Sequence, residues 1–189
     1  MIIGLLGKKR AGKDTVAATL VRDFGFTRVA FADALKEVAL GLDPIVQLTR
    51  VEPYGDRAVR LSEIVEARGW ELAKETAEVR RTIQRLGVAA RSVDPDLWLR
   101  VGVDTILRQR DSGPVVVTDV RFPNEAEAIR GLDGLLFRVV RPGTGIGDTH
   151  ESEVALDHLT PDLTLANDAG VTELQTRVAE AMRSVSHHV

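Results

Sequence analysis

The feature that most constrains the fold is a glycine-rich loop that directly follows an apolar stretch. Residues Ile2–Leu6 are apolar apart from one glycine, and the loop then fits the pattern G-x-x-x-x-G-K over Gly7–Lys13. The two glycines allow a tight turn whose backbone N–H groups point inward and bind an anion. A helix expected over residues 13–24 would direct the positive end of its dipole to the same place. This order of strand, loop and helix indicates an α/β protein that binds a nucleotide.

The basic residues of the loop are also typical of phosphate binding. Three consecutive cations, Lys8, Lys9 and Arg10, repel one another unless an anion lies between them. Lys13 is placed to reach the β- and γ-phosphates of a nucleotide. The alternative is an ordinary glycine turn at the start of a helix. The expected nucleotide-binding residues are Gly7, Lys8, Lys9, Arg10, Ala11, Gly12, Lys13, Asp14 and Thr15.

Two carboxylates are candidate Mg²⁺ ligands. The loop departs from its usual pattern at Asp14, where Ser or Thr normally supplies a hydroxyl, and Thr15 follows one position later. A carboxylate binds Mg²⁺ directly or through its waters, so the metal site is changed but still expected. Asp119 ends an apolar run, as the acid of a Walker B strand does. The alternative for Asp119 is a turn residue without a ligand.

Short apolar runs alternate with stretches of helical period along the 189 residues, a length that predicts one domain. Runs that are apolar throughout indicate strands buried on both faces, in a parallel sheet covered by helices. The expected strands are residues 2–6, 28–31, 115–118, 135–140 and 163–166. The expected helices are 13–24, 33–40, 61–68, 71–86, 95–110, 123–130, 151–156 and 171–184. Residues 41–60 and 142–149 are expected to be irregular.

Two polar clusters are candidates for a second anion site. Asp33 and Lys36 lie one helical turn apart, although Asp33 also suits a helix cap. Arg81 and Gln84 lie on one face of a helix, where a guanidinium and an amide can hold a phosphate and a base edge. Arg91 follows on the same segment. The alternative for the second cluster is a solvated helix face.

A third cluster is typical of a mobile lid. Arg138 and Arg141 flank the glycine-rich segment Gly143–Gly147, and Glu151 and Glu153 follow. Arginines on a loop that closes over substrate add positive charge to a phosphoryl-transfer transition state. The alternative is that one arginine pairs with a nearby glutamate at the surface.

Composition excludes several other classes. The chain has no cysteine, so disulfides and thiolate metal sites are excluded. A net charge of -3 argues against a protein that mainly binds nucleic acid. The apolar runs are far shorter than the ~18 residues of a membrane span, and residues Met1–Leu6 do not have the pattern expected of a signal peptide. We expect a cytoplasmic protein without nucleic-acid or membrane partners.

In this order the clusters resemble the deoxynucleoside monophosphate kinases of bacteriophages, within the P-loop nucleoside monophosphate kinase-like superfamily. The most specific matches are G-K-D-T at Gly12–Thr15 and D-V-R-F-P-N-E-A at Asp119–Ala126. The resemblance also covers Phe31–Lys36, Arg81–Trp98, His150–Glu153 and Leu165–Gly170.

The resemblance implies a three-layer P-loop NTPase fold with a parallel five-stranded sheet flanked by helices. It implies a helical deoxynucleotide-binding insertion over about residues 41–100 and a lid over about residues 138–153, within a single kinase domain of residues 1–189. It also implies ATP and Mg²⁺ as co-substrate and cofactor, a homodimer, and the host cytoplasm if the chain is phage-encoded.

The activity that the resemblance implies is transfer of the ATP γ-phosphoryl group to a deoxynucleoside monophosphate (dNMP). Lys13, Arg138 and Arg141 would be catalytic, Asp14 and Asp119 would hold the metal, and Asn167 would border the adenine. The dNMP contacts would be Asp33, Lys36, Arg81, Gln84, Arg91, Arg121 and Glu151.

Two other functions stay open at this point. Animal-type phosphomevalonate kinases share the G-K-D loop, although Phe122–Glu125 is more similar to the phage enzymes. A non-enzymatic ATP-binding switch would need only one nucleotide site. The bases accepted, and the exclusion of ribonucleotides, do not follow from the sequence.

Overall fold

The computed structural model describes residues 1–145 and 155–186. The chain forms two compact units, which are described separately. The sheet unit contains Met1–Phe31 and Leu99–Val189, and the inserted unit is the continuous stretch Ala32–Trp98. Among the described residues, no helix combines the length and the apolar character that crossing a membrane requires.

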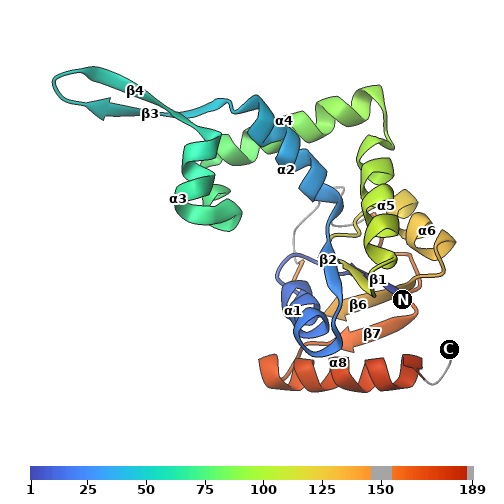
Figure 1. Cartoon of the computed structure of the whole chain (residues 1–189). Helices are drawn as coiled ribbons and strands as arrows, with labels where there is room; N and C mark the ends of the chain where they lie inside the picture. Colours follow the sequence, from blue (N-terminus) through green and yellow to red (C-terminus); the bar gives the residue numbers. More distant parts are fainter. Residues whose placement is uncertain (146–154, 187–189) are drawn as a thin grey trace. The chain divides into compact units, whose positions relative to one another are not determined.

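The sheet unit is built on five parallel strands in the order β2-β5-β1-β6-β7 (Figure 1). The strand β1 lies at the centre, with Ile2 beside Val115 of β5 and Ile3 beside Leu135 of β6. This arrangement confirms the parallel five-stranded sheet that the apolar runs predict. The strands are β1 Ile2–Leu6, β2 Thr27–Val29, β5 Val115–Val117, β6 Leu135–Val140 and β7 Leu163–Ala166.

Helices pack on both faces of this sheet and give the fold its three layers. Side chains alternate along β1, so Ile3 and Leu5 join one core cluster while Ile2 and Leu6 join another. The first cluster includes residues of α1 and α8, and the second includes residues of α5 and α6. These helices are α1 Lys13–Phe24, α5 Leu97–Arg110, α6 Pro123–Gly131 and α8 Val171–Ser186.

The inserted unit contains three helices and a two-stranded antiparallel hairpin. Its core is a separate apolar cluster that includes Ala39, Val46, Leu61 and Val79. The elements are α2 Phe31–Leu42, β3 Ile45–Val51, β4 Gly55–Arg60, α3 Leu61–Ala73 and α4 Ala77–Val93.

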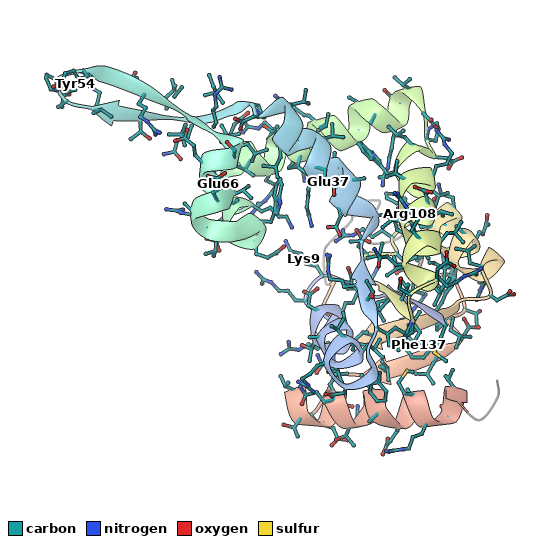
Figure 2. All side chains as sticks on the ribbon, in the orientation of Figure 1. Lys9, Glu37, Tyr54, Glu66, Arg108 and Phe137 are labelled. Atoms are coloured by element: carbon teal, nitrogen blue, oxygen red, sulfur yellow. The ribbon has the colours of Figure 1, made fainter. Side chains whose placement is uncertain are left out.

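The expectation of an irregular stretch over residues 41–60 is wrong, because β3 and β4 lie there. The two strands pair from Ile45 with Arg60 to Val51 with Gly55. Tyr54 lies at the tip of the hairpin and is 87% exposed (Figure 2). Of the residues of β3, only Val46 is buried. The hairpin therefore lacks the continuous apolar run that marks the strands of the main sheet.

Several element boundaries also differ from the expected ones. The strand β2 ends at Val29, and α2 begins at Phe31, inside the expected strand 28–31. The helix α4 begins at Ala77, six residues after the expected start at residue 71. Gly69, inside α3, has φ of 71°, and this left-handed residue kinks the chain where the sequence predicts a gap between helices.

Candidate phosphate-binding site

The phosphate loop packs so closely against its neighbours that two of its positions require glycine. Gly7 has φ of 138°, and a Cβ there would lie 2.4 Å from the carbonyl oxygen of Val139. Gly12 has φ of 111°, and a Cβ there would lie 2.5 Å from Nδ2 of Asn167. L-residues rarely adopt such φ values, so both glycines are needed for conformation and for space.

Lys13 lies at the start of α1, and its ammonium turns back onto the loop. Its Nζ donates to the carbonyl oxygens of Gly7 at 2.6 Å and Lys8 at 3.0 Å. The N–H of Ala11 donates to the same Lys8 carbonyl at 3.1 Å. The ammonium and the loop backbone thus form one compact polar group. Lys9, by contrast, is exposed at this loop (Figure 2).

Asn167, directly after β7, contacts the loop. Its Nδ2 donates to the carbonyl oxygen of Ala11 at 2.8 Å, and its backbone N–H donates to Val140 O at 2.7 Å. The side chain therefore joins the phosphate loop to the end of the sheet. The expected contact of Asn167 with adenine stays a prediction.

Arg177 of α8 binds the residues on both sides of Asn167. Its Nη1 donates to the carbonyl oxygen of Ala166 at 2.6 Å and to Oδ1 of Asp168 at 2.8 Å. The hydrogen bond to the Asp168 carboxylate raises the pKa of Arg177 above its ordinary value. The segment after β7 is thus fixed by a side chain that sequence analysis did not single out.

Asp119 follows β5 by two residues and binds the start of α2. Its Oδ1 accepts a hydrogen bond of 2.8 Å from the backbone N–H of Phe31. The sequence allowed Asp33 to be the cap of this helix, but Asp33 lies inside α2 and forms an ion pair with Lys36 at 2.8 Å. Asp119 is the residue that binds a free N–H of the first turn.

The carboxylates Asp14 and Asp119 suit the way in which proteins hold Mg²⁺. Magnesium is usually bound by one or two carboxylates, with phosphate oxygens and waters as its other ligands. Asp14 is exposed in the first turn of α1. Within residues 1–145 and 155–186, no group of three or more His, Cys, Asp or Glu side chains forms a metal cluster. The donor chemistry therefore fits a metal that is bound together with a nucleotide.

A cavity of about 280 Å³ lies beside the phosphate loop. Leu6, Val120, Val140 and Leu156 are among its apolar lining residues. Its cationic lining residues come from three segments that are distant in the sequence, namely Lys8, Arg121, Arg138 and Arg141. The structure therefore brings Arg121 together with both of the arginines expected in the lid.

The arginines of the expected lid differ in their surroundings. Arg138 lies within β6, and its Nη2 donates to the carbonyl oxygens of Leu156 at 2.6 Å and Leu159 at 2.7 Å. Arg141 is exposed, and its guanidinium makes no hydrogen bond or ion pair within the part of the chain that the structure describes. The alternative pairing with Glu151 or Glu153 involves residues outside that part.

The residues expected to bind the dNMP fall on both units. Arg121 lines the cavity of the sheet unit, and Glu151 lies outside the described residues. The others lie on α2 and α4 of the inserted unit, namely Asp33, Lys36, Arg81, Gln84 and Arg91. Arg81 and Gln84 are both exposed, one turn apart, and Arg81 pairs with Glu78.

Sequence analysis missed two acidic residues of the site. Asp157 lines the cavity and pairs with Lys8, but no local pattern connects these two residues. Glu125 is buried and accepts a 2.7 Å hydrogen bond from the N–H of Arg121. A signal for Glu125 was present, because a Glu three residues after a helix N-cap commonly binds free backbone N–H groups.

Comparisons with known proteins agree on one family. A family model described as deoxynucleotide monophosphate kinase matches residues 40–178. The chain is 29% identical to a protein of Acanthamoeba polyphaga mimivirus, provisionally named a deoxynucleotide monophosphate kinase, and the alignment covers 98% of both. It is 30% identical over 109 residues to the deoxynucleotide monophosphate kinase of Enterobacteria phage T4, covering 56% of this chain and 45% of the phage protein. The match thus spans less than half of that phage relative.

Solved structures share the fold at low sequence identity. The dephospho-CoA kinase from Campylobacter jejuni matches with a TM-score of 0.53 and 11% identity, over 99% of this chain and 98% of that one. TT1252 from Thermus thermophilus matches with a TM-score of 0.50 and 19% identity, over 97% and 96%. These likenesses support the P-loop kinase fold alone.

Proposed function

The chain belongs to the deoxynucleotide monophosphate kinase family, and we propose that it transfers the γ-phosphoryl group of ATP to a dNMP. The products are ADP and a deoxynucleoside diphosphate. The observation that carries this proposal is the cavity beside the phosphate loop, where Lys8, Arg121, Arg138 and Arg141 all line one space. A kinase with a phosphate acceptor binds two anionic groups close together, whereas a switch binds only one nucleotide.

The transfer is an in-line displacement. An oxygen of the dNMP phosphate attacks the γ-phosphorus, and the bond to the oxygen that bridges the β- and γ-phosphates breaks. The protein positions two anions and stabilises the charge that develops between them. The groups that stabilise this charge are Lys13, the loop N–H groups, Arg138 and Arg141. No side chain acts as a general base, because a phosphate monoester with a second pKa near about 6 is largely ionised at neutral pH.

The remaining expected contacts form part of the same proposal. Asp14 and Asp119 would hold Mg²⁺, which would supply positive charge that stabilises the transferring phosphate. Asn167 lies at the adenine. The dNMP contacts are Asp33, Lys36, Arg81, Gln84, Arg91, Arg121 and Glu151. We also propose a homodimer that acts in the host cytoplasm and supplies deoxynucleotides.

The test is a coupled assay of ADP formation with the four common dNMPs, their ribose forms and phosphomevalonate. We expect turnover with at least one dNMP, and a product that chromatography identifies as the diphosphate. Lys13→Ala serves as the inactive control. Turnover with phosphomevalonate alone favours a phosphomevalonate kinase. ATP binding without turnover of any acceptor favours the switch.

A further inference from the structure

Glu125 is the only charged residue that is buried within residues 1–145 and 155–186. It is 4% exposed and lies in the first turn of α6. Its Oε2 accepts hydrogen bonds from the backbone N–H groups of Arg121, at 2.7 Å, and Phe122, at 3.1 Å. Burial of a carboxylate is costly unless hydrogen bonds compensate for the lost water. The two N–H donors supply that compensation, so the side chain and this backbone segment fix each other.

Two N–H groups at the start of α6 also bind within the segment itself. The N–H of Glu125 donates to Oδ1 of Asn124 at 3.0 Å, and the N–H of Ala126 donates to the carbonyl oxygen of Phe122 at 3.1 Å. A helix start binds phosphate through N–H groups that have no protein partner. Here a side chain and the backbone of the segment itself use both of these donors. The cationic residue that this segment contributes to the cavity is Arg121.

The backbone at Arg121 is held from two sides. Val120, directly before it, is 3% exposed and packs in the core cluster that contains Leu6 and Ala126. The N–H of Arg121 itself is bound by Glu125. Both Val120 and Arg121 line the cavity. A fixed backbone lowers the number of positions that the long Arg121 side chain samples, and this preorganisation strengthens the binding of a phosphate.

We propose that Glu125 is a positioning residue, which holds Arg121 ready for the 5′-phosphate of the acceptor. The inference rests on the proposed function and deepens it, because it assigns the site of Arg121 to the acceptor phosphate and gives Arg121 a buried support. Glu125 does not touch the substrate. Its effect passes through the backbone of the Arg121–Phe122 segment.

Substitutions at Glu125 separate its hydrogen bonds from its charge. Glu125→Ala removes the acceptor, and we expect the KM for the dNMP to rise about tenfold, with the KM for ATP changed less than about twofold. Glu125→Gln keeps an oxygen that accepts hydrogen bonds, so the KM for the dNMP should rise only about threefold. Glu127→Ala, on the exposed face of the same helix, is the matched control and should behave as the wild type.

A double-mutant cycle with Arg121→Ala tests whether Glu125 acts through Arg121. We expect Arg121→Ala alone to raise the KM for the dNMP, and the effect of either Glu125 substitution to fall to less than about twofold in that background. Calorimetric titration of the dNMP without ATP should show the same pattern in the dissociation constant. Where Glu125→Ala fails to fold, the cycle is run with Glu125→Gln, which conserves the volume.

The outcomes separate this inference from the proposed function. Two results with an active wild type overturn the positioning role. In the first, the Glu125 substitutions raise the KM for ATP and the KM for the dNMP equally. In the second, they raise the KM for the dNMP by the same factor with and without Arg121. A wild type that phosphorylates no dNMP overturns the proposed function, whatever the Glu125 variants do. Rescue by Glu125→Gln together with loss of the effect in the Arg121→Ala background supports the inference.

Discussion

Lys8 of the phosphate loop and Asp157, 149 residues later in the chain, form an ion pair with 2.5 Å between Nζ and Oδ1. The turn that carries Asp157 is itself anchored, because Leu156 is buried and its carbonyl oxygen accepts from Arg138. A lysine proposed to bind ATP phosphate is therefore held by a carboxylate on a fixed turn. Under the proposed function, ATP and Asp157 compete for one ammonium group.

This competition predicts the effect of Asp157→Asn. Loss of the carboxylate removes one competitor for the Lys8 ammonium, so we expect ATP to bind about threefold more tightly, as measured by calorimetry. The gain should disappear in a Lys8→Ala background. Weaker ATP binding in Asp157→Asn would mean instead that the ion pair holds Lys8 in its productive position.

Lys13→Ala removes the ammonium that lies on the loop carbonyls. We expect turnover to fall at least ~100-fold, the scale of losing one charge contact in a transition state. Circular dichroism should show an unchanged fold, since the side chain is only partly buried. Turnover within a few fold of the wild type would exclude the loop as the phosphate site.

Substitutions at Asp14 distinguish a metal ligand from an acid that only interacts with the dipole of α1. As a metal ligand, Asp14→Ala should raise the Mg²⁺ concentration for half-maximal rate, and Asp14→Ser should partly restore it. As an acid that only interacts with the helix dipole, it should alter thermal stability slightly and leave the Mg²⁺ dependence unchanged. A titration of rate against Mg²⁺ in the three proteins decides between these roles.

Replacing Arg141 by Ala should lower turnover alone, whereas replacing Arg138 by Ala should also lower thermal stability. Arg141 has no side-chain partner within the described residues, so Arg141→Ala should lower turnover about tenfold while melting temperature and ATP affinity stay near wild type. Arg138→Ala should also lower the melting temperature, because the carbonyl oxygens of Leu156 and Leu159 lose their donor. Single-turnover rates and thermal denaturation measure both effects. Equal melting temperatures in the two variants would contradict the anchoring role of Arg138.

The inserted unit should lose stability in acid through Asp43. The N–H of Ser62 donates to Oδ1 of Asp43 at 2.9 Å, and this bond holds the pKa of Asp43 below its ordinary value. A lowered pKa in the folded state stabilises the protein above the unfolded pKa, and that contribution is lost as pH falls through the folded pKa. The protection factors of the α3 amides in hydrogen exchange should therefore fall on acidification less in Asp43→Asn than in the wild type. An identical pH dependence of the protection factors in both proteins would show that Asp43 does not contribute to the loss of stability in acid.

The sheet was predictable because its strands are buried on both faces. The residues of β1 are apolar throughout, apart from one glycine, and all of them are buried in the structure. The hairpin was not predictable in this way, since polar residues such as Gln47 and Thr49 alternate with exposed apolar ones such as Leu48. This alternation spans only Val46–Thr49, and β4 shows none, so the pattern is too short to distinguish a strand from a polar loop.

Residues of the candidate site could be predicted only where a local sequence pattern marks them. The loop Gly7–Thr15 and the carboxylate of Asp119 each follow a strand, and that context can be inferred from the order of residues. The ion pair of Lys8 with Asp157 has no such signal, because it depends on where a distant turn packs. The bonds from Arg138 to the carbonyl oxygens of Leu156 and Leu159 are equally hidden, since any sequence supplies backbone carbonyls.

The division of the chain has a consequence for how such enzymes diversify. The inserted unit is one uninterrupted stretch, Ala32–Trp98, while the sheet unit is assembled from the two flanking stretches. A single recombination event that replaces residues 32–98 would exchange most of the proposed dNMP contacts and leave the phosphate loop, Asp119 and Arg141 untouched. Under the proposed function, replacement of this one stretch would change acceptor choice and keep the residues of phosphoryl transfer.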